Sequence, residues 1–306
     1  MIEQPGSRRC RVYRQFFESY VMSHSANRRS TLLGLLAACC VTPRAWSAAT
    51  SDLEIGILPN ISTQVLLSQY QPIREFMQRR LGRGVQISTA PSWSVFHQRT
   101  MALEYDLVVT ASHLARIAQL ELGYAPLVTY DPPIKGLIAF AKNRPIANIG
   151  DIKGQTLVLS NPKSLVTLRG FQWLEEMGLK RSRDYKTIHT PTDDSVGNVV
   201  LHQDAVAAML SGGEYRAIPN AIKEQLQVMT TFAEVPGFVV LANPRLAPEL
   251  IQSVKQEWLN FSNGSPEGQA FFATTGFTAM RELPPGLMAS MDPYVTATKA
   301  LMAEPG

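Results

Sequence analysis

Apolar and polar residues follow a regular order between positions 52 and 122, and that order predicts strands and helices in turn. Residues 52–58 alternate as a half-buried strand does. An apolar stripe then recurs at helical spacing across residues 64–81 and stops at Gly82, which is typical of a helix and its C-terminal cap. The same criteria predict strands at 85–89 and 106–109 and helices at 92–103 and 114–122. Such alternation predicts a mainly parallel sheet with right-handed crossovers.

A second series of the same kind begins after a long apolar strand at residues 134–141. The strand–helix order restarts at residues 156–159 and continues with a helix that ends near Gly178. Beyond it the pattern predicts a strand at 185–189, a helix at 194–202, a strand at 205–209, a second apolar strand at 237–242, helices at 248–260 and 267–274, and a helical C-terminus.

The two series together predict an α/β protein with two α/β lobes joined by a two-strand hinge. Lobe one would be discontinuous, with residues 50–135 and 238–306, and lobe two would be residues 136–237 inserted between them. The apolar strands at 134–141 and 237–242 would be the only covalent links, and a ligand cleft would lie between the lobes. Ligands of open α/β sheets bind beyond the carboxyl ends of the strands, where helices start.

Polar side chains gather at two of these predicted helix starts. They are Thr110, Ser112 and His113 after the strand at 106–109, and Ser160, Ser164 and Thr167 after the strand at 156–159. A helix start offers unpaired backbone N–H groups and the positive end of the helix dipole, so such residues can hold an anion. The same hydroxyl groups can also serve as ordinary helix caps, and His113 can be a partly buried turn residue. Both interpretations stay open.

The basic residues in excess are confined to the start of the chain. Residues 1–47 carry seven arginines and two acids, which leaves 22 basic and 23 acidic residues downstream. Without a basic excess beyond residue 47, the sequence has no electrostatic footprint for nucleic acid. A hydrophobic content of 45% and a charged content of 18% indicate a globular chain.

Residues 1–49 have the order of an export signal. The pair Arg28–Arg29 precedes an apolar run at residues 31–41, and a small-residue segment follows at 45–49. The paired arginines followed by two leucines resemble a twin-arginine signal, so we predict a periplasmic protein exported by that route. Met22 would start a signal of ordinary length, in which case residues 1–21 are an over-extended gene start. The alternative is a long n-region.

A lipid anchor is the second interpretation of this segment. Residues 36–39 end at Cys39 and resemble the lipobox of bacterial lipoproteins. Ordinary cleavage after Ser47 or Ala49 would instead remove Cys10, Cys39 and Cys40, which are the three cysteines of the chain. The mature protein would then contain no disulfide, zinc–thiolate site or cysteine nucleophile.

The rest of the sequence does not favour catalysis. Residues 160–163 match the Ser-x-x-Lys motif of penicillin-binding enzymes, but they include Pro162 and no Lys-Thr-Gly accompanies them. The histidines show no spacing suited to zinc. We therefore predict no enzyme, no metal site and no cofactor.

Over nearly all of residues 53–283 the sequence resembles the periplasmic substrate-binding components of phosphate, phosphite and phosphonate ABC importers. The segments that carry the resemblance are LEIGILPN, YQPIREFMQRRLGRGVQI, YDLVVTASHLARIAQ, GLIAFAKNRPIANIGDIKGQTLVLSNPKS and SPEGQAFFATTGF. The resemblance implies the two-lobed, hinged fold of periplasmic binding proteins.

The resemblance also implies positions for the ligand, and several of them differ here. Family members that bind phosphonates carry Ser-Thr-Ser-Gly at the helix start of lobe two, whereas residues 164–167 are Ser-Leu-Val-Thr. An aromatic residue of the site is kept in kind as Trp93, and a histidine of the site aligns with Asp193. Glu214 is an approximate counterpart of one family acid, while Phe238 replaces another. Trp93 can equally pack the lobe edge, and Asp193 can cap the helix that follows it.

These observations predict a periplasmic solute-binding protein that captures a small phosphate- or phosphonate-like oxyanion and delivers it to the permease of an ABC importer. The alternative is a periplasmic ligand-sensing subunit that signals to a membrane histidine kinase. If Asp193 and Asp194 line the cleft, they would repel a bare dianion unless a hydrogen is shared. We therefore expect a protonated oxyanion or an anion that also carries a neutral or cationic group.

Overall fold

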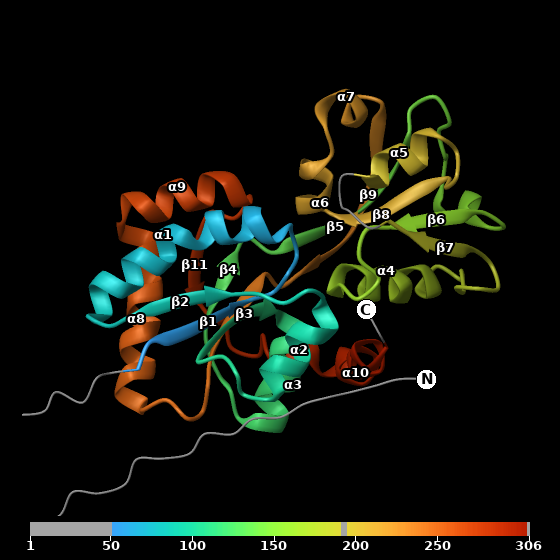
Figure 1. Cartoon of the computed structure of the whole chain (residues 1–306). Coiled ribbons are helices and arrows are strands. Elements are labelled where there is room, and N and C mark those ends of the chain that lie inside the picture. The colour runs from blue at the N-terminus through green and yellow to red at the C-terminus, as the bar shows by residue number, and fades with distance from the viewer. Residues whose placement is uncertain (1–50, 191–194, 305–306) are drawn as a thin grey trace, which may run out of the picture. The chain divides into compact units, whose positions relative to one another are not determined.

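The computed structural model of the chain describes residues 51–190 and 195–304 (Figure 1). Within it, residues Ala48–Gly306 form a compact unit of their own. The predicted export signal, with Arg28–Arg29 and Cys39, lies outside the described residues, as does Asp193. The signal and its processing therefore stay predictions.

The first of two sheets has six strands in the order β11-β4-β10-β3-β1-β2. Their bounds are β1 Leu53–Ile57, β2 Val85–Ser88, β3 Leu107–Ala111, β4 Ala125–Asp131, β10 Phe238–Ala242 and β11 Ala279–Glu282. β1 is parallel to β2 and β3, whereas β10 is antiparallel to β3 and β4, and β11 is antiparallel to β4. The sheet is thus mixed and not mainly parallel, because β10 returns from the second lobe between two strands of the first.

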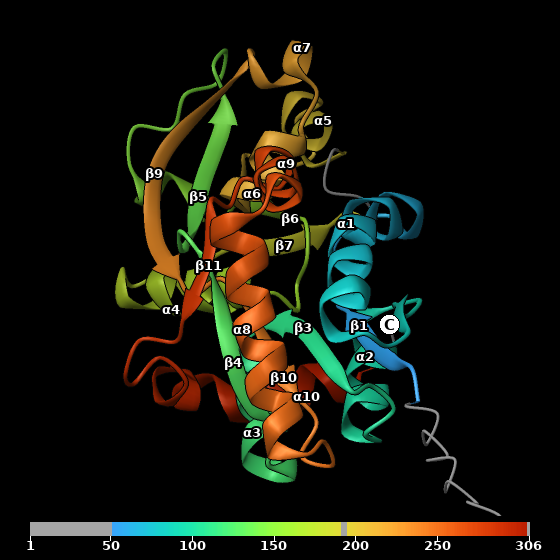
Figure 2. The same ribbon diagram turned by 90° about the vertical axis from the view of Figure 1, so that its left-hand side faces the viewer.

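Helices cover both faces of this sheet (Figures 1 and 2). Their bounds are α1 Thr63–Leu81, α2 Trp93–Met101, α3 Ser112–Leu122, α8 Pro248–Gly264, α9 Pro266–Thr275 and α10 Val295–Ala303. Side chains of a strand point alternately to the two faces. Accordingly, Leu107 and Val109 of β3 pack in the core that includes Leu66 of α1 and Trp258 of α8. Val108 packs in the opposite core, with residues of α2, α3 and α10.

The second sheet has five strands in the order β7-β6-β8-β5-β9. The elements of this part are β5 Ile134–Ala141, η1 Ile149–Ile152, β6 Thr156–Leu159, α4 Leu165–Glu176, β7 Lys186–His189, α5 Val196–Leu201, β8 Ala207–Ser211, α6 Gly212–Ala217, α7 Asn220–Lys223 and β9 Leu226–Val235. β6 is parallel to β7 and β8, and β5 is antiparallel to β8 and β9. α4 packs on one face and α5 on the other.

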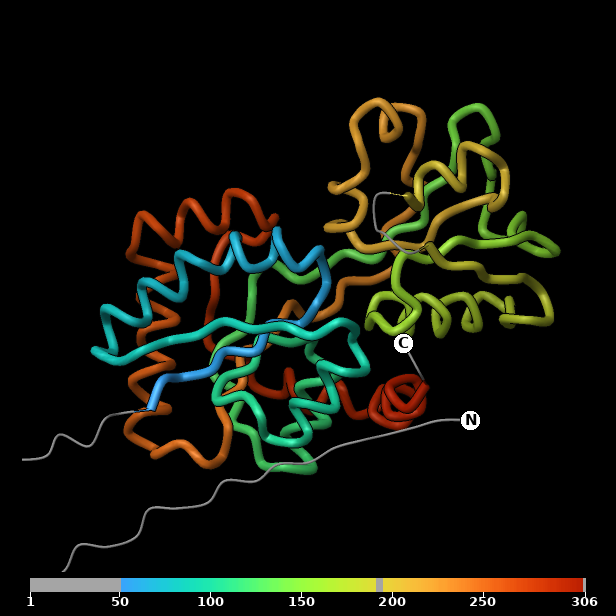
Figure 3. Tube along the Cα trace, viewed as in Figure 1, coloured from blue at the N-terminus to red at the C-terminus, as the bar shows by residue number. Residues whose placement is uncertain are grey.

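The chain passes between the two sheets at two short segments, which Figure 3 shows as adjoining tubes. β4 is followed by Pro132 and Pro133 and then by β5, and β9 is followed by Pro236 and Gly237 and then by β10. A Cβ atom at Gly237 would lie 2.4 Å from the carbonyl oxygen of Tyr130, so this crossing requires glycine. The fold is therefore two-lobed. We keep the predicted lobe boundaries as a working division.

The C-terminal segment contacts both lobes. Met302 of α10 packs in a core of the first sheet, whereas Met291, in the 3-10 helix η3 Ala289–Tyr294, packs in a core of the second. Asp292 pairs with Arg116 of α3 at 2.7 Å, and the Tyr294 hydroxyl donates to Gln172 of α4 at 3.3 Å. Residues 289–294 therefore lie against the first and the second lobe at once.

Candidate ligand-binding site

Three polar side chains are buried where β3 ends and α3 begins. Thr110, Ser112 and His113 are 2%, 1% and 0% exposed. Thr110 Oγ1, Ser112 Oγ and His113 Nδ1 have no hydrogen-bond partner among the described residues. Buried polar atoms in proteins are nearly always hydrogen-bonded, so three unpaired ones within four residues call for an explanation. They lie at the carboxyl edge of a sheet, where α/β proteins bind ligands.

The imidazole of His113 presents an acceptor at this place. Its Nε2 lies 3.2 Å from the carbonyl oxygen of Lys163, and because a carbonyl can only accept, Nε2 carries the hydrogen. Burial lowers the pKa of His113 to about 4, although the hydrogen bond to Lys163 works in the opposite direction. The ring is therefore neutral at pH 7, and Nδ1 is a bare acceptor. His113 therefore has no free N–H group with which to hold an anion, although it could hold one through a hydrogen on the ligand.

The hydroxyl groups at the start of α4 are paired with one another. Ser164 is the N-cap residue, and its Oγ accepts from the backbone N–H of Thr167 and donates to Thr167 Oγ1, both at 3.1 Å. Thr167 Oγ1 donates in turn to the carbonyl of Asn161 at 2.8 Å. Ser160, at the end of β6, is 8% exposed. Ser164 thus caps the helix, and its oxygen lone pairs and those of Thr167 are the groups that remain for a ligand.

Lys163 joins the two helix starts. While its carbonyl accepts from His113, its Nζ donates to Ser94 Oγ at 2.6 Å and to the carbonyl of Glu304 at 3.0 Å. Both acceptors are uncharged, and Lys163 has no ion pair within residues 51–190 and 195–304. No carboxylate among the described residues therefore neutralises this ammonium group, which lies at Ser94, the residue after Trp93. The sequence offered one signal for it, a lysine directly before the cap of a helix that faces the cleft.

Trp93 lies beside His113, with 6.4 Å between their ring centroids. It is the first residue of α2, after the cap residue Ser92, whose hydroxyl accepts from the N–H of Val95. Its indole N–H donates to the carbonyl of Pro59 at 3.1 Å, which fixes the ring across the end of β1. Trp93 and His113 are thus brought together.

Glu214 is engaged elsewhere. It forms a capping box at the start of α6, in which its carboxylate accepts from the backbone N–H of Ser211 and its own N–H donates to Ser211 Oγ. No hydrogen bond or ion pair among the described residues joins it to Ser112, His113 or Ser164. The neighbouring Arg216 donates to the carbonyl of Thr275, so α6 touches lobe one at a second place.

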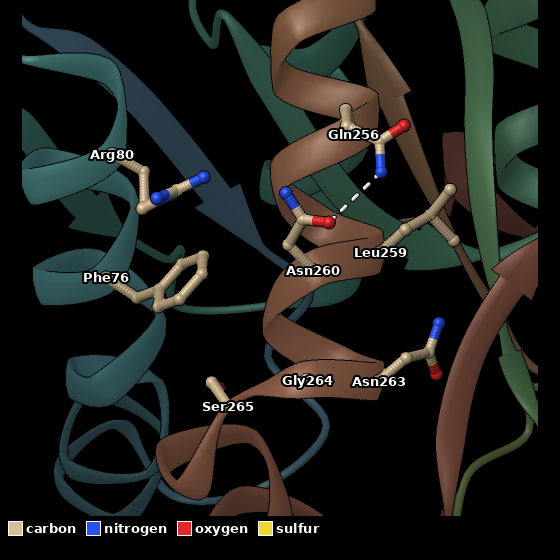
Figure 4. A pocket seen from close by; sticks show the side chains of 8 residues that line it. All are labelled: Phe76, Arg80, Gln256, Leu259, Asn260, Asn263, Gly264 and Ser265. Atoms are coloured by element: carbon tan, nitrogen blue, oxygen red, sulfur yellow. Dashed lines mark hydrogen bonds between the residues drawn. The ribbon is translucent and has the colours of Figure 1, made fainter.

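Two hollows of the described surface lie away from these residues. One, of about 700 Å³, lies between α1 and α8 and is lined by Phe76, Arg80, Gln256, Leu259, Asn260, Asn263, Gly264 and Ser265 (Figure 4). The other, of about 250 Å³, lies where the chain crosses between the sheets. Neither includes a predicted ligand residue, which agrees with the direct contact between the two helix starts at Lys163.

None of the helices in residues 51–190 and 195–304 combines the length and the apolar character that a bilayer span requires. The fold and the two facing helix starts define a two-lobed binding protein of the periplasmic type. A model of the family described as "ABC transporter, phosphonate, periplasmic substrate-binding protein" matches residues 55–284. The chain belongs to this family, whose members are substrate-binding proteins and not a class of enzyme.

Solved structures share the fold. PhnD1 from Prochlorococcus marinus (MIT 9301), in complex with methylphosphonate, has a TM-score of 0.71 and 13% identity, covering 81% of this chain and 98% of its own. A binding protein component of an ABC phosphonate transporter from Pseudomonas aeruginosa has a TM-score of 0.67 and 14% identity, covering 83% and 90%. The periplasmic aliphatic sulphonate binding protein SsuA from Escherichia coli has a TM-score of 0.58 and 16% identity, covering 83% and 94%. No curated protein matches the sequence.

Proposed function

We propose that this protein captures a small phosphonate-like oxyanion between the starts of α3 and α4 and delivers it to the permease of an ABC importer. The observation that carries the proposal is the cluster of buried, unpaired polar atoms on Thr110, Ser112 and His113, whose ring contacts the backbone carbonyl of Lys163. A bound anion would give the two hydroxyl groups an acceptor, and an O–H group on that anion would give Nδ1 of His113 a donor. The protein would bind the anion and would not catalyse a reaction on it.

Electrostatics favours an anion at this place. The N-terminus of a helix stabilises negative charge by roughly 0.3–1 kcal/mol when exposed and more when it is partly buried, and here two such ends converge. Lys163 adds a full positive charge whose present partners, Ser94 Oγ and the carbonyl of Glu304, are neutral. An oxyanion would replace these neutral acceptors with a charged one, and hydrogen bonds to charged groups are the stronger kind.

Trp93 would form one wall of the site. Its ring lies beside His113 and is held by Pro59, so it can cover the apolar substituent of an organic anion without moving. The relatives named above support this ligand class, because one was solved with methylphosphonate and another is described as an aliphatic sulphonate binding protein. We also propose Asp193 for the site, where its carboxylate would accept a hydrogen bond from a ligand that carries a donor.

The importer role rests on the family, which is that of an ABC transporter component. It implies export, for which we propose the twin-arginine route, with lipid attachment at Cys39 as the other possible fate of the signal. Uptake of radiolabelled methylphosphonate by cells with and without the gene tests delivery. Normal uptake together with a lost transcriptional response to the anion would overturn delivery in favour of the sensing role.

Binding itself is tested by isothermal titration of the purified protein with methylphosphonate, phosphite and phosphate. We expect at least one to bind, and Ser112→Ala and Trp93→Ala to bind it more weakly. Ser253→Ala is the matched control, because its hydroxyl is exposed on α8 and donates only within that helix. If Ser112→Ala, Trp93→Ala and Ser164→Ala all bind within about threefold of the parent, about 0.6 kcal/mol, the ligand binds elsewhere.

A further inference from the structure

We propose that Nδ1 of His113 accepts a hydrogen from the bound anion, so that the site selects a protonated phosphonate over a sulfonate of the same shape and charge. This inference rests on the proposed function and specifies the ligand of the same site. It starts from an acceptor atom that is buried and has no partner among the described residues.

The chemical state of the ring follows from its contacts. The Nε2–H group is committed to the carbonyl of Lys163 at 3.2 Å, which orients the ring and leaves the lone pair of Nδ1 free. The side chain is fully buried, so solvent does not reach Nδ1. Burial also lowers the pKa of His113 to about 4, so the imidazole stays neutral near pH 5.5 and above.

The neighbouring groups have complementary roles. The hydroxyls of Thr110 and Ser112 are unpaired and can donate to the charged oxygens of an anion. The ammonium group of Lys163, which donates to Ser94 Oγ and the carbonyl of Glu304 in this structure, would turn to the anion and supply one positive charge. With it the site would offer one cation, two hydroxyl donors and one acceptor that cannot donate. A monoanion with a single O–H group matches this set.

Two small anions differ in this respect alone. The methylphosphonate monoanion and methanesulfonate have the same tetrahedral shape and the same charge. The phosphonate keeps one P–O–H group, whereas the three sulfonate oxygens carry no hydrogen. A sulfonate oxygen would therefore place its lone pair against the lone pair of Nδ1, and the two would repel each other. A site that accepts a hydrogen from its ligand binds an analogue without that hydrogen more weakly. We expect at least a tenfold difference in affinity, about 1.4 kcal/mol.

The experiment is isothermal titration of the purified protein with both anions at about pH 5.5, below the second pKa of about 6 of phosphate esters, where the phosphonate keeps its proton. The parent should bind methylphosphonate at least about tenfold more tightly. His113→Gln places an amide N–H near the former Nε2, so the bond to Lys163 can persist while the Nδ1 acceptor is lost. In this variant the two affinities should lie within about threefold, mainly through weaker methylphosphonate binding. His113→Asn places a carbonyl oxygen near the former Nδ1 and should retain the preference.

A second measurement protects the test against misfolded variants. In the parent, the ¹⁵N resonance of His113 Nδ1 should report a bare nitrogen without ligand and a hydrogen-bonded one with methylphosphonate, and it should not change with methanesulfonate. Equal affinities of the parent for both anions, or a preference that survives in His113→Gln, would overturn this inference and leave the proposed function standing. If the parent binds neither methylphosphonate nor any other oxyanion tested, both fall.

Discussion

The starts of helices α3 and α4 carry the same kinds of side chain, but they satisfy their hydrogen bonds differently. At α3, the polar atoms of Thr110, Ser112 and His113 are buried without partners in the described residues. At α4, Ser164 and Thr167 bond to each other and to the backbone of the same turn. The first arrangement costs stability until something binds, whereas the second stabilises its own helix. Sites that bind a ligand commonly retain such a cost, and simple caps do not.

The strongest way to break this comparison is to remove the unpaired hydroxyls. Thr110→Val together with Ser112→Ala should weaken methylphosphonate binding about 100-fold or more, because two hydrogen bonds to a charged ligand contribute roughly 1.5–3 kcal/mol each. The melting temperature without ligand should stay the same or rise, because both hydroxyls are unpaired there. Calorimetric titration and scanning calorimetry measure the two effects. An unchanged affinity with a lower melting temperature would show that these hydroxyls are structural.

The buried histidine gives a second, pH-dependent test. Burial lowers the pKa of His113 from 6.5 to about 4, so below pH 6.5 the unfolded chain binds a proton that the folded chain does not. Stability should therefore fall as the pH decreases from 6.5 towards 4. Between pH 6.5 and 5 the loss from this residue should be about 1.6 kcal/mol, at 1.36 kcal/mol per pKa unit and with the unfolded histidine half protonated at pH 6.5.

Urea unfolding of the parent and of His113→Gln at pH 7 and pH 5 isolates this contribution. His97, on α2, also has a pKa lowered by burial, so the parent loses stability from both residues. The difference between parent and variant belongs to His113. If both proteins lose the same stability between the two pH values, His113 is not held neutral and the acceptor at Nδ1 does not exist.

The two helix starts could be located from the sequence, because each depends on a local pattern. A short apolar run, a break and a polar residue before helical spacing identify β3–α3 and β6–α4 to within two residues. The family resemblance, confirmed by the match over residues 55–284, agreed with the two lobes that the pattern predicts. What the pattern could not give is the bonding state of the hydroxyls. Ser112 and Ser164 look alike in the sequence, and only packing separates an unpaired hydroxyl from a cap.

Contacts between residues far apart in the sequence could not be predicted either. Lys163 meets His113, Ser94 and Glu304, which are 50, 69 and 141 positions away. Likewise, Met291 in the C-terminal segment packs in the core of lobe two, although the sequence gave no reason to separate it from lobe one. Periodicity reports which face of an element is buried and not what buries it.

Three strands were missed for local reasons. β4 contains Pro126, which weakens the strand signal. β9 is an edge strand in which seven of ten residues are half-buried or exposed, so its alternation is blurred. β11 has four residues, two of them charged, and lies at the edge of its sheet. All three owe their place to pairing with a neighbouring strand.

Lys163→Met sharpens the comparison at the point where the two helix starts meet. Methylphosphonate binding should weaken about tenfold, because one charge-assisted hydrogen bond is lost. Without ligand, the radius of gyration in solution scattering should increase, since the bonds from Nζ to Ser94 and Glu304 tie the lobes together. Lys180→Met is the matched control, an exposed lysine whose partner is Glu175. Parent-like affinity and scattering in Lys163→Met would mean that this ammonium group neither binds the anion nor holds the lobes.

The smallest expected effect concerns the cap of α4. Ser164→Ala removes the acceptor for the N–H of Thr167, and loss of such a cap costs about 1 kcal/mol of stability. Because the hydroxyl already serves the helix, methylphosphonate affinity should stay within about threefold of the parent. Urea unfolding and calorimetric titration measure the two quantities, with Ser112→Ala as the reverse case, stable but weak in binding. A Ser164→Ala protein that keeps the parent's stability and loses tenfold or more in affinity would reverse the assignment. Ser164 would then bind the ligand instead of capping α4, and the starts of α3 and α4 would no longer differ in how their hydroxyl groups are used.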